Sequence, residues 1–196
     1  MTTAASPAPG NAVVRSPVVR RGGLIPLLTV LLTVIGAACG SGTGDNSGFS
    51  KIPPDTTRRE IDDFARSGFK KTREYDVTGL PGAISAHRVY FTPGGSEPLQ
   101  YEFRFYPDHA TAVEKGVEYA DEVSGPDALL REVDVRWKEG TRDRRGGGAF
   151  RDSLTPLYGD FAVFGNVILL CEGRDSDQSL DRCAALVRAA GIDVEG

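Results

Sequence analysis

The sequence has few of the residues on which most enzyme and metal chemistry depends. Its 196 residues include two histidines, three cysteines, one tryptophan and one methionine. Lysine and arginine, 23 in total, are outnumbered by 27 acidic residues, and the net charge at pH 7 is −4. Since phosphate backbones are bound mainly by lysine and arginine, this composition argues against a nucleic-acid-binding protein. It also argues against attachment to acidic lipids through a basic surface.

The two histidines have no partner at a spacing typical of catalysis or metal binding. Nothing in the sequence brings His87 or His109 to a serine, a cysteine or a second metal ligand. We expect His87 to be a satisfied, partly buried side chain in a strand and His109 to belong to the start of a helix. The sequence therefore predicts no cofactor and no metal, and it favours a protein that is not an enzyme.

One acidic run resembles the opening of a calcium-binding loop. Asp175, Asp177, Ser179 and Asp181 alternate along the chain. Leucine, however, occupies the sixth and twelfth positions, where such a loop needs glycine and glutamate. We expect these acids to cap a helix and complement its dipole instead.

The apolar run near the N-terminus is too short for a permanent membrane span. Residues 24–38 form an uncharged run of 15 residues that contains Pro26, whereas a spanning helix takes about 20 apolar residues. Arginines precede the run, small residues end it, and no acidic residue occurs before position 39. This pattern is typical of a secretory signal peptide. The pair Arg20 and Arg21 is also compatible with the twin-arginine export route. That signal, however, prefers two apolar residues after the arginines, and here two glycines follow, so the general secretion route is favoured.

The end of this run resembles the lipobox of bacterial lipoproteins. In that family, small residues precede a cysteine that receives diacylglycerol through its sulfur before the leader is cleaved. Here residues 35–38 precede Cys39, with Gly36 at the position that is usually leucine-like. The resemblance implies that Cys39 becomes the lipid-modified N-terminus of the mature protein. The alternative is an ordinary secretory peptide cut near Ala38, with Cys39 unmodified.

The resemblance implies that the chain is divided into three segments and that the mature protein lies at the outer side of a membrane. Residues 1–38 would be the signal peptide, residues 39–52 the lipidated cysteine with a flexible glycine- and serine-rich tether, and residues 53–196 a globular domain. Loss of three arginines with the leader changes the net charge from −4 to 20 − 27 = −7. Several acyl chains on one cysteine would hold this acidic domain at the cell membrane, facing outside the cytoplasm.

With Cys39 assigned to the lipid, two of the three cysteines remain. Export would place them in an oxidising compartment, where disulfides persist. Cys171 ends the apolar run 167–170, and Cys183 lies within a helical pattern. We therefore predict a disulfide that joins the last strand to the last helix and stabilises the fold by about 3 kcal/mol. A redox pair would need the closer spacing of thioredoxin-like motifs, and a metal site would need more ligands nearby.

The pattern of the expected domain predicts a single small α+β domain. Its mostly antiparallel sheet would have about five to six strands, covered by about three helices. Pairing Phe91 with Leu99 across the turn 93–98 places Arg88 opposite Glu102, and this charge pair supports the register. The alternation along strand 99–105 then turns the residues of one face towards water. These are Gln100, Glu102 and Arg104.

Other elements are predicted from local signals. A capping box of Thr57 and Glu60 predicts a helix that ends at Gly68. Residues 108–123 predict a second helix, capped by Asp108. The alternation over 133–137 predicts a half-exposed strand. Two more strands, 160–164 and 167–171, would meet at a two-residue turn, and a last helix would span 177–190.

The polar segment 139–148 is the preferred candidate for a functional surface. Its arginines and successive glycines could bind an anion through guanidinium groups and backbone amides, although it lacks the lysine and hydroxyl of a P-loop. The alternative is a solvated, flexible loop. The candidate residues are Arg142, Arg144, Arg145, Gly146 and Gly147.

Together these features favour a non-enzymatic, membrane-anchored binding or interaction protein. Its partners would be the membrane, through the lipid, and an envelope protein or a small-molecule ligand. One alternative is a small hydrolase or transferase with a deep pocket that holds a histidine beside a nucleophile. Another is a structural or assembly accessory of the cell envelope.

Overall fold

The computed structural model describes residues 49–147 and 154–193. The expected signal peptide, and Cys39 with most of its tether, lie outside the described residues. Phe49 is buried, and its ring centroid lies 6.5 Å from that of Phe164. Packing against the core therefore begins before the expected boundary at position 53. Within the described residues, no helix combines the length and the apolar character that crossing a membrane requires.

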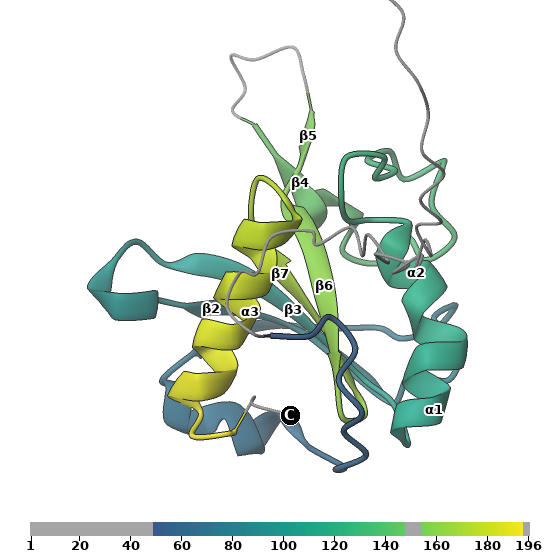
Figure 1. Ribbon diagram of the computed structural model, residues 1–196. Helices are drawn as coiled ribbons and strands as arrows, with labels where there is room; N and C mark the ends of the chain where they lie inside the picture. The colour runs from purple at the N-terminus through teal and green to yellow at the C-terminus, as the bar shows by residue number, and fades with distance from the viewer. Residues whose placement is uncertain (1–48, 148–153, 194–196) are drawn as a thin grey trace, which may run out of the picture. The chain divides into compact units, whose positions relative to one another are not determined.

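A five-stranded antiparallel sheet forms the centre of the domain, in the order β1-β2-β3-β7-β6 (Figure 1). β4 and β5 form a separate two-stranded ribbon. The expected α+β class and its mostly antiparallel sheet are confirmed. The strands are β1 (Lys70–Tyr75), β2 (Ser85–Phe91), β3 (Leu99–Phe105), β4 (Arg145–Gly146), β5 (Thr155–Pro156), β6 (Tyr158–Phe164) and β7 (Val167–Glu172).

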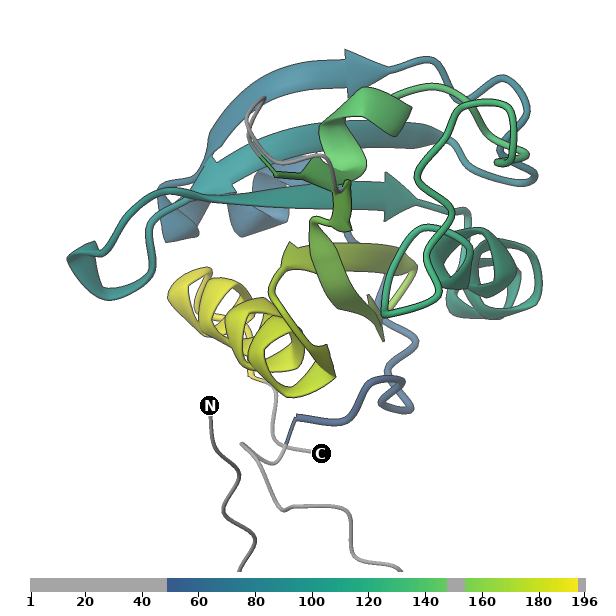
Figure 2. The same cartoon turned by 90° about the horizontal axis from the view of Figure 1, so that it is seen from above.

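Helical segments cover both faces of this sheet. One face carries α3 (Ser176–Ala189) and the 3-10 helix η1 (Ile61–Ser67). The other face carries a helix built from α1 (His109–Thr111), the π-helical turn η3 (Ala112–Gly116) and α2 (Val117–Asp121). In Figure 2, α3 and α2 lie on opposite sides of β6 and β7. Two further 3-10 turns are η2 (Pro93–Gly95) and η4 (Thr141–Arg144).

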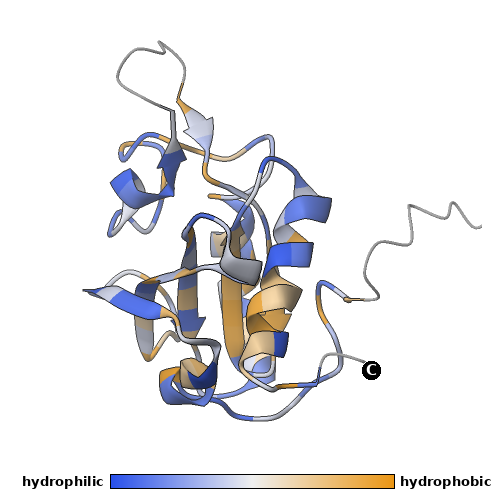
Figure 3. Ribbon diagram, turned by 90° about the vertical axis from the view of Figure 1, so that its left-hand side faces the viewer, coloured by the Kyte–Doolittle hydropathy of each residue, from blue (hydrophilic) through white to orange (hydrophobic). Residues whose placement is uncertain are grey.

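β7 is apolar on both faces because both faces are covered. Val167 and Leu169 belong to the cluster that contains α3 and η1 side chains, whereas Ile168 and Leu170 belong to the cluster beneath α2. All four side chains are buried. Figure 3 shows apolar residues gathered on the central strands and on α3. A central strand with two buried faces reads as a continuous hydrophobic run, as this one does.

Both hairpins have the expected pairing. Phe91 pairs with Leu99, and Arg88 stands opposite Glu102 in the β2–β3 hairpin. The β6–β7 hairpin turns at residues 165–166, where the glycine has a φ of 58°. That conformation is the one a primed two-residue turn requires. The expected last helix is also confirmed as α3.

The first helix is shorter than expected. The capping box of Thr57 with Glu60 is not formed; instead the carboxylate of Asp63 accepts a 2.7 Å hydrogen bond from the backbone N–H of Glu60. The Arg59 N–H donates to the side-chain oxygen of Asn166 at 2.6 Å, and the Asn166 amide donates back to the Arg59 carbonyl at 3.1 Å. These two bonds hold the preceding backbone against the β6–β7 turn, so only seven residues, those of η1, become helical.

Residues 133–137 do not form the expected strand. They run as an irregular segment in which Val135 and Trp137 are buried. The Arg136 N–H donates to the carboxylate of Glu122 at 2.7 Å, so the backbone is bonded to the end of α2 and not to a strand. The segment covers the core by inserting Val135 and Trp137, whereas Val133, the first apolar residue of the alternation, is 79% exposed.

Candidate functional site

A large cleft lies where the end of α2, the start of β6, the end of β7 and the beginning of α3 meet. We call it the α2–α3 cleft. Its volume is about 1240 Å³. Its lining residues are Lys51, Asp121, Ser124, Gly125, Pro126, Asp127, Thr155, Pro156, Leu157, Gly159, Asp160, Glu172, Gly173, Arg174, Asp175, Ser176, Gln178 and Arg182.

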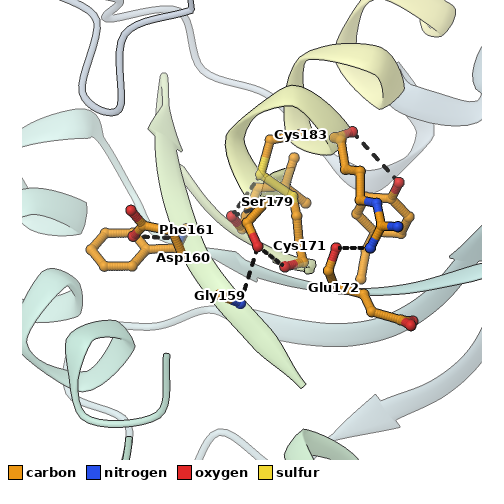
Figure 4. Close-up of a disulfide and its surroundings, with 10 residues drawn as sticks. Gly159, Asp160, Phe161, Cys171, Glu172, Ser179 and Cys183 are labelled. Carbon is orange, nitrogen blue, oxygen red and sulfur yellow. Dashed lines mark hydrogen bonds between the residues drawn. A yellow bond between two sulfur atoms is a disulfide. The ribbon is translucent and has the colours of Figure 1, made fainter. Parts of the chain in front are cut away.

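Two glycines allow the backbones around the cleft to approach closely. A Cβ at Gly159 would lie 2.3 Å from the carbonyl oxygen of Asp175, and one at Gly173 would lie 2.2 Å from the hydroxyl of Ser179. Ser179 is fully buried, accepts a 3.0 Å bond from the Gly159 N–H and donates a 2.9 Å bond to the Cys171 carbonyl. Figure 4 shows the hydrogen bonds that this serine of α3 makes with Gly159 and Cys171. One hydroxyl thus joins β6, β7 and α3 beside the cleft.

The expected disulfide is confirmed and lies next to this junction (Figure 4). Cys171 of β7 and Cys183 of α3 are bonded, with 5.7 Å between their Cα atoms. Both residues are fully buried. A buried bond between these elements fixes the first turns of α3 relative to the strand that leads into the cleft.

A lysine and an aspartate form an ion pair in the wall of the cleft. The Lys51 ammonium lies 2.7 Å from the Asp160 carboxylate and 4.0 Å from the centre of the Phe161 ring. The Ser176 hydroxyl donates to the other Asp160 oxygen at 2.5 Å. The Lys51 carbonyl accepts a 2.8 Å bond from the Val163 N–H. The segment before η1 therefore covers part of the outer edge of β6 and supplies a cationic group to the cleft.

Of the acids expected to cap the last helix, Asp175 is the N-cap and Asp177 lies in the first turn. The Asp175 side chain accepts a 2.8 Å bond from the Gln178 N–H at the start of α3. Within the described ranges, no group of three or more histidine, cysteine, aspartate or glutamate side chains is arranged to hold a metal ion. Asp175 also lines the cleft, but its capping bond already uses one carboxylate oxygen.

Neither histidine lines the cleft. His87 is buried in β2, and burial lowers the pKa of its imidazole. Its Nδ1 makes no hydrogen bond and lies 4.0 Å from a carboxylate oxygen of Glu74, so the expectation that this side chain is satisfied is wrong for that atom. His109 begins α1 as expected, with Nδ1 2.8 Å from the Gly165 carbonyl. Among the described residues, the hydrogen bonds join neither imidazole to a serine, threonine or cysteine side chain.

The structure does not bring the expected anion-binding residues together. Arg144 is buried and paired with Glu102, whereas Arg142 is exposed and lines a separate pocket of about 260 Å³. Residues 141–146 are ordered as η4 and β4, so this part of the expected flexible loop has regular structure. The other expected residues form or follow β4: Arg145, Gly146 and Gly147.

The inward turn of Arg144 completes a buried ionic group with two residues expected to face water. Glu102 and Arg104 of β3 are fully buried, because the irregular segment 126–140 and the α1–α2 helix cover this face of the sheet. Burial alone would raise the pKa of the Glu102 carboxyl, but the guanidinium groups of Arg144 and Arg104 hold it below its usual range. One feature of the sequence indicates this burial. The neighbouring strand β7 is apolar at successive positions, which is typical of a strand whose two faces are both covered.

Comparison with known proteins gives one family. A family model described as "Family of unknown function (DUF6810)" matches residues 60–191. No curated protein and no solved structure matches this chain. The matched range begins just before η1 and ends just after α3, so it contains the whole central sheet and nearly all of the cleft.

Proposed function

The chain belongs to the DUF6810 family of unknown function, and we propose that it is a non-enzymatic lipoprotein that binds a small polar ligand in the α2–α3 cleft outside the cytoplasm. The cleft is the observation that carries this proposal. Its volume of about 1240 Å³ is ample for a small molecule, since ligand pockets measure about 300–1,000 Å³. It is lined by hydroxyl, amide and charged side chains, which supply directional contacts.

The lining favours a neutral or cationic ligand. Five acidic and three basic side chains line the cleft, which gives 3 − 5 = −2. Two of the bases are already engaged, because Lys51 pairs with Asp160 and the Arg182 guanidinium donates to the Glu172 carbonyl at 2.8 Å. A phosphorylated or polycarboxylate ligand would meet repulsion here. We therefore expect a molecule that carries amino or hydroxyl groups.

The location outside the cytoplasm is supported by two features of the chain. Buried structural disulfides such as Cys171–Cys183 persist mainly in oxidising compartments. The N-terminal pattern resembles a lipoprotein leader with Cys39 as the acceptor of lipid. Lys51 follows Cys39 by 12 residues, which span at most about 40 Å when fully extended. A lipid at Cys39 would thus keep the cleft close to the membrane surface.

An enzyme is the less supported alternative. The small hydrolase or transferase considered above requires His87 or His109 beside a nucleophile in a pocket, and neither residue lines the cleft. The hydroxyl of Ser176 donates to Asp160, whose other oxygen is bonded to Lys51. That carboxylate is thus committed to a charge pair and is a poor general base.

Replacing Cys39 by alanine is expected to prevent lipid attachment and to release from the membrane any chain that has lost its leader. Without acyl chains or leader, the acidic domain would have no apolar anchor, so the membrane-bound fraction of leaderless protein should fall at least about tenfold. Fractionation and mass spectrometry of the mature N-terminus measure this change. Ser47→Ala, in the same spacer, is the matched control and should stay membrane-bound. An unmodified thiol at position 39 in membrane-bound wild-type protein would refute the lipid anchor.

Removing cleft acids is expected to weaken ligand binding. We expect amine-bearing probes such as spermidine, arginine and glucosamine to raise the melting temperature, whereas citrate at equal ionic strength should not. The double variant Asp121→Asn/Asp127→Asn should bind the stabilising probe about fivefold more weakly, because two attractive charges are lost. Asp62→Asn, an exposed acid of η1, is the control. Preferential stabilisation by citrate, or equal affinity in both variants, would contradict the assignment of the cleft.

A further inference from the structure

Among the residues that the structure describes, three interior guanidinium nitrogens have no hydrogen-bond acceptor. They are Nη1 and Nη2 of Arg104 and Nη1 of Arg144. Arg104 has a relative exposure of 0% and Arg144 of 2%, so bulk water does not reach either group. Buried donors of a charged group without acceptors are strongly unfavourable. These atoms therefore point to a missing acceptor.

The local charge is also unbalanced. Both Glu102 oxygens are used, because one accepts from Arg104 Nε at 2.7 Å and from Arg144 Nη2 at 3.1 Å, and the other accepts from Arg144 Nε at 2.8 Å. One buried carboxylate thus serves two buried guanidinium groups. The sum of 2 − 1 leaves an excess charge of +1 within this group.

In the described part of the chain, the neighbouring side chains do not supply the missing negative charge. Asp143 bonds to Arg88, to Arg73 at 3.4 Å and to the Tyr75 hydroxyl at 2.9 Å. The Trp137 ring lies over both guanidinium groups, with its centre 4.9 Å from Arg104 Cζ and 4.4 Å from Arg144 Cζ. Its indole N–H donates to a carbonyl at 3.1 Å and offers no acceptor.

We infer that Arg104 and Arg144 form an interior site for a single halide-sized inorganic monoanion, with Trp137 as one wall. Such an ion would accept from unpaired N–H groups of these guanidinium groups and cancel the excess charge. The ion must be small, because neither Arg104 nor Arg144 lines either of the pockets described above. An interior water would accept some of the same bonds but would leave the charge uncompensated.

Trp137 is the single tryptophan of the chain, so tryptophan fluorescence reports on this site alone. Its exposure is 3%, so collisional quenching by iodide from solution should be weak. If iodide enters the site beside the ring, quenching should saturate with concentration and be reversed by chloride. In Arg104→Met the saturable component should be lost or its affinity reduced at least tenfold, because hydrogen bonds to a charged group are removed.

Arg136→Met is the matched control for quenching. Arg136 also lies over an aromatic ring, with its Cζ 4.2 Å from the centre of Tyr119, but its side chain is 42% exposed. This variant should keep the saturable quenching. Saturable quenching that survives unchanged in Arg104→Met would place the iodide elsewhere and overturn the inference.

A second measurement needs no variant. Replacing sodium gluconate by sodium chloride at constant ionic strength should raise the melting temperature of the wild-type chain by about 3 to 6 °C, because only the folded state holds the ion. Caesium chloride should act as sodium chloride does. Equal melting temperatures in chloride and gluconate, with quenching that rises linearly, would mean that only water meets these donors.

Discussion

Glu102→Gln is expected to lower the free energy of unfolding by about 3 to 5 kcal/mol, the largest effect of any single polar substitution proposed for this chain. The substitution leaves two buried guanidinium groups, Arg104 and Arg144, without their carboxylate. Uncompensated buried charge is far more costly than the loss of an exposed ion pair. Urea unfolding measures the change, and the midpoint should fall by roughly 2 M.

Glu97→Gln provides the control, because this glutamate is exposed in the turn between β2 and β3. Its free energy of unfolding should stay within about 0.5 kcal/mol of wild type. The pKa of Glu102 is held below its usual range, so its stabilisation is present above the unfolded pKa and is lost as the pH falls through the folded pKa. Glu102→Gln should therefore lose less stability than wild type on acidification. A variant as stable as the control would contradict the buried-charge argument.

Removing the disulfide is expected to lower stability by about 3 kcal/mol, since it closes a short loop in the unfolded chain. The double variant Cys171→Ala/Cys183→Ala, made in a Cys39→Ala background, should melt about 6 to 12 °C below its parent. The two sulfurs are fully buried, so the loss also includes packing between β7 and α3. Thermal unfolding followed by circular dichroism gives the measurement.

Reductant distinguishes the covalent bond from other effects of substitution. Prolonged treatment of the parent with reductant under mildly denaturing conditions should lower its melting temperature towards that of the double variant. The same treatment should not change the double variant. An equal shift in both proteins would show that the bond between Cys171 and Cys183 is not the source of the stability difference.

The hairpins and the last helix could be predicted because their signals are local. Residues 165–166 supply a turn with positive φ, and Asp175 supplies a cap whose bond to Gln178 lies within four residues. The register of β2 with β3 followed from Phe91 opposite Leu99, because alternation and one charge pair agree. Such features depend on neighbours in sequence or across a short turn, so a single sequence contains them.

The alternation of apolar and polar residues along β3 does not predict that the second face of the sheet is covered. Polar residues at alternate positions of β3 suggest water on one face, yet Gln100, Glu102 and Arg104 are all buried there. Their burial depends on Arg144, which follows Glu102 by 42 residues. The prediction of a strand at 133–137 is wrong for a related reason. Alternating apolar and polar residues occur both in strands and in irregular segments that cover a core. The α2–α3 cleft draws its walls from several separate segments, and no local signal marks it.

The hydrogen bond from Val163 to the Lys51 carbonyl has a mechanical consequence. Tension applied to the chain before Phe49 would reach the domain at the outer margin of β6, where Phe49 rests on Phe164 and the Lys51 ammonium rests on Asp160. Peeling this segment away would remove a cation from the cleft. Tension on the N-terminal segment and a ligand bound in the cleft would therefore act on the same lysine. Pulling on this segment would change the affinity of the cleft for its ligand.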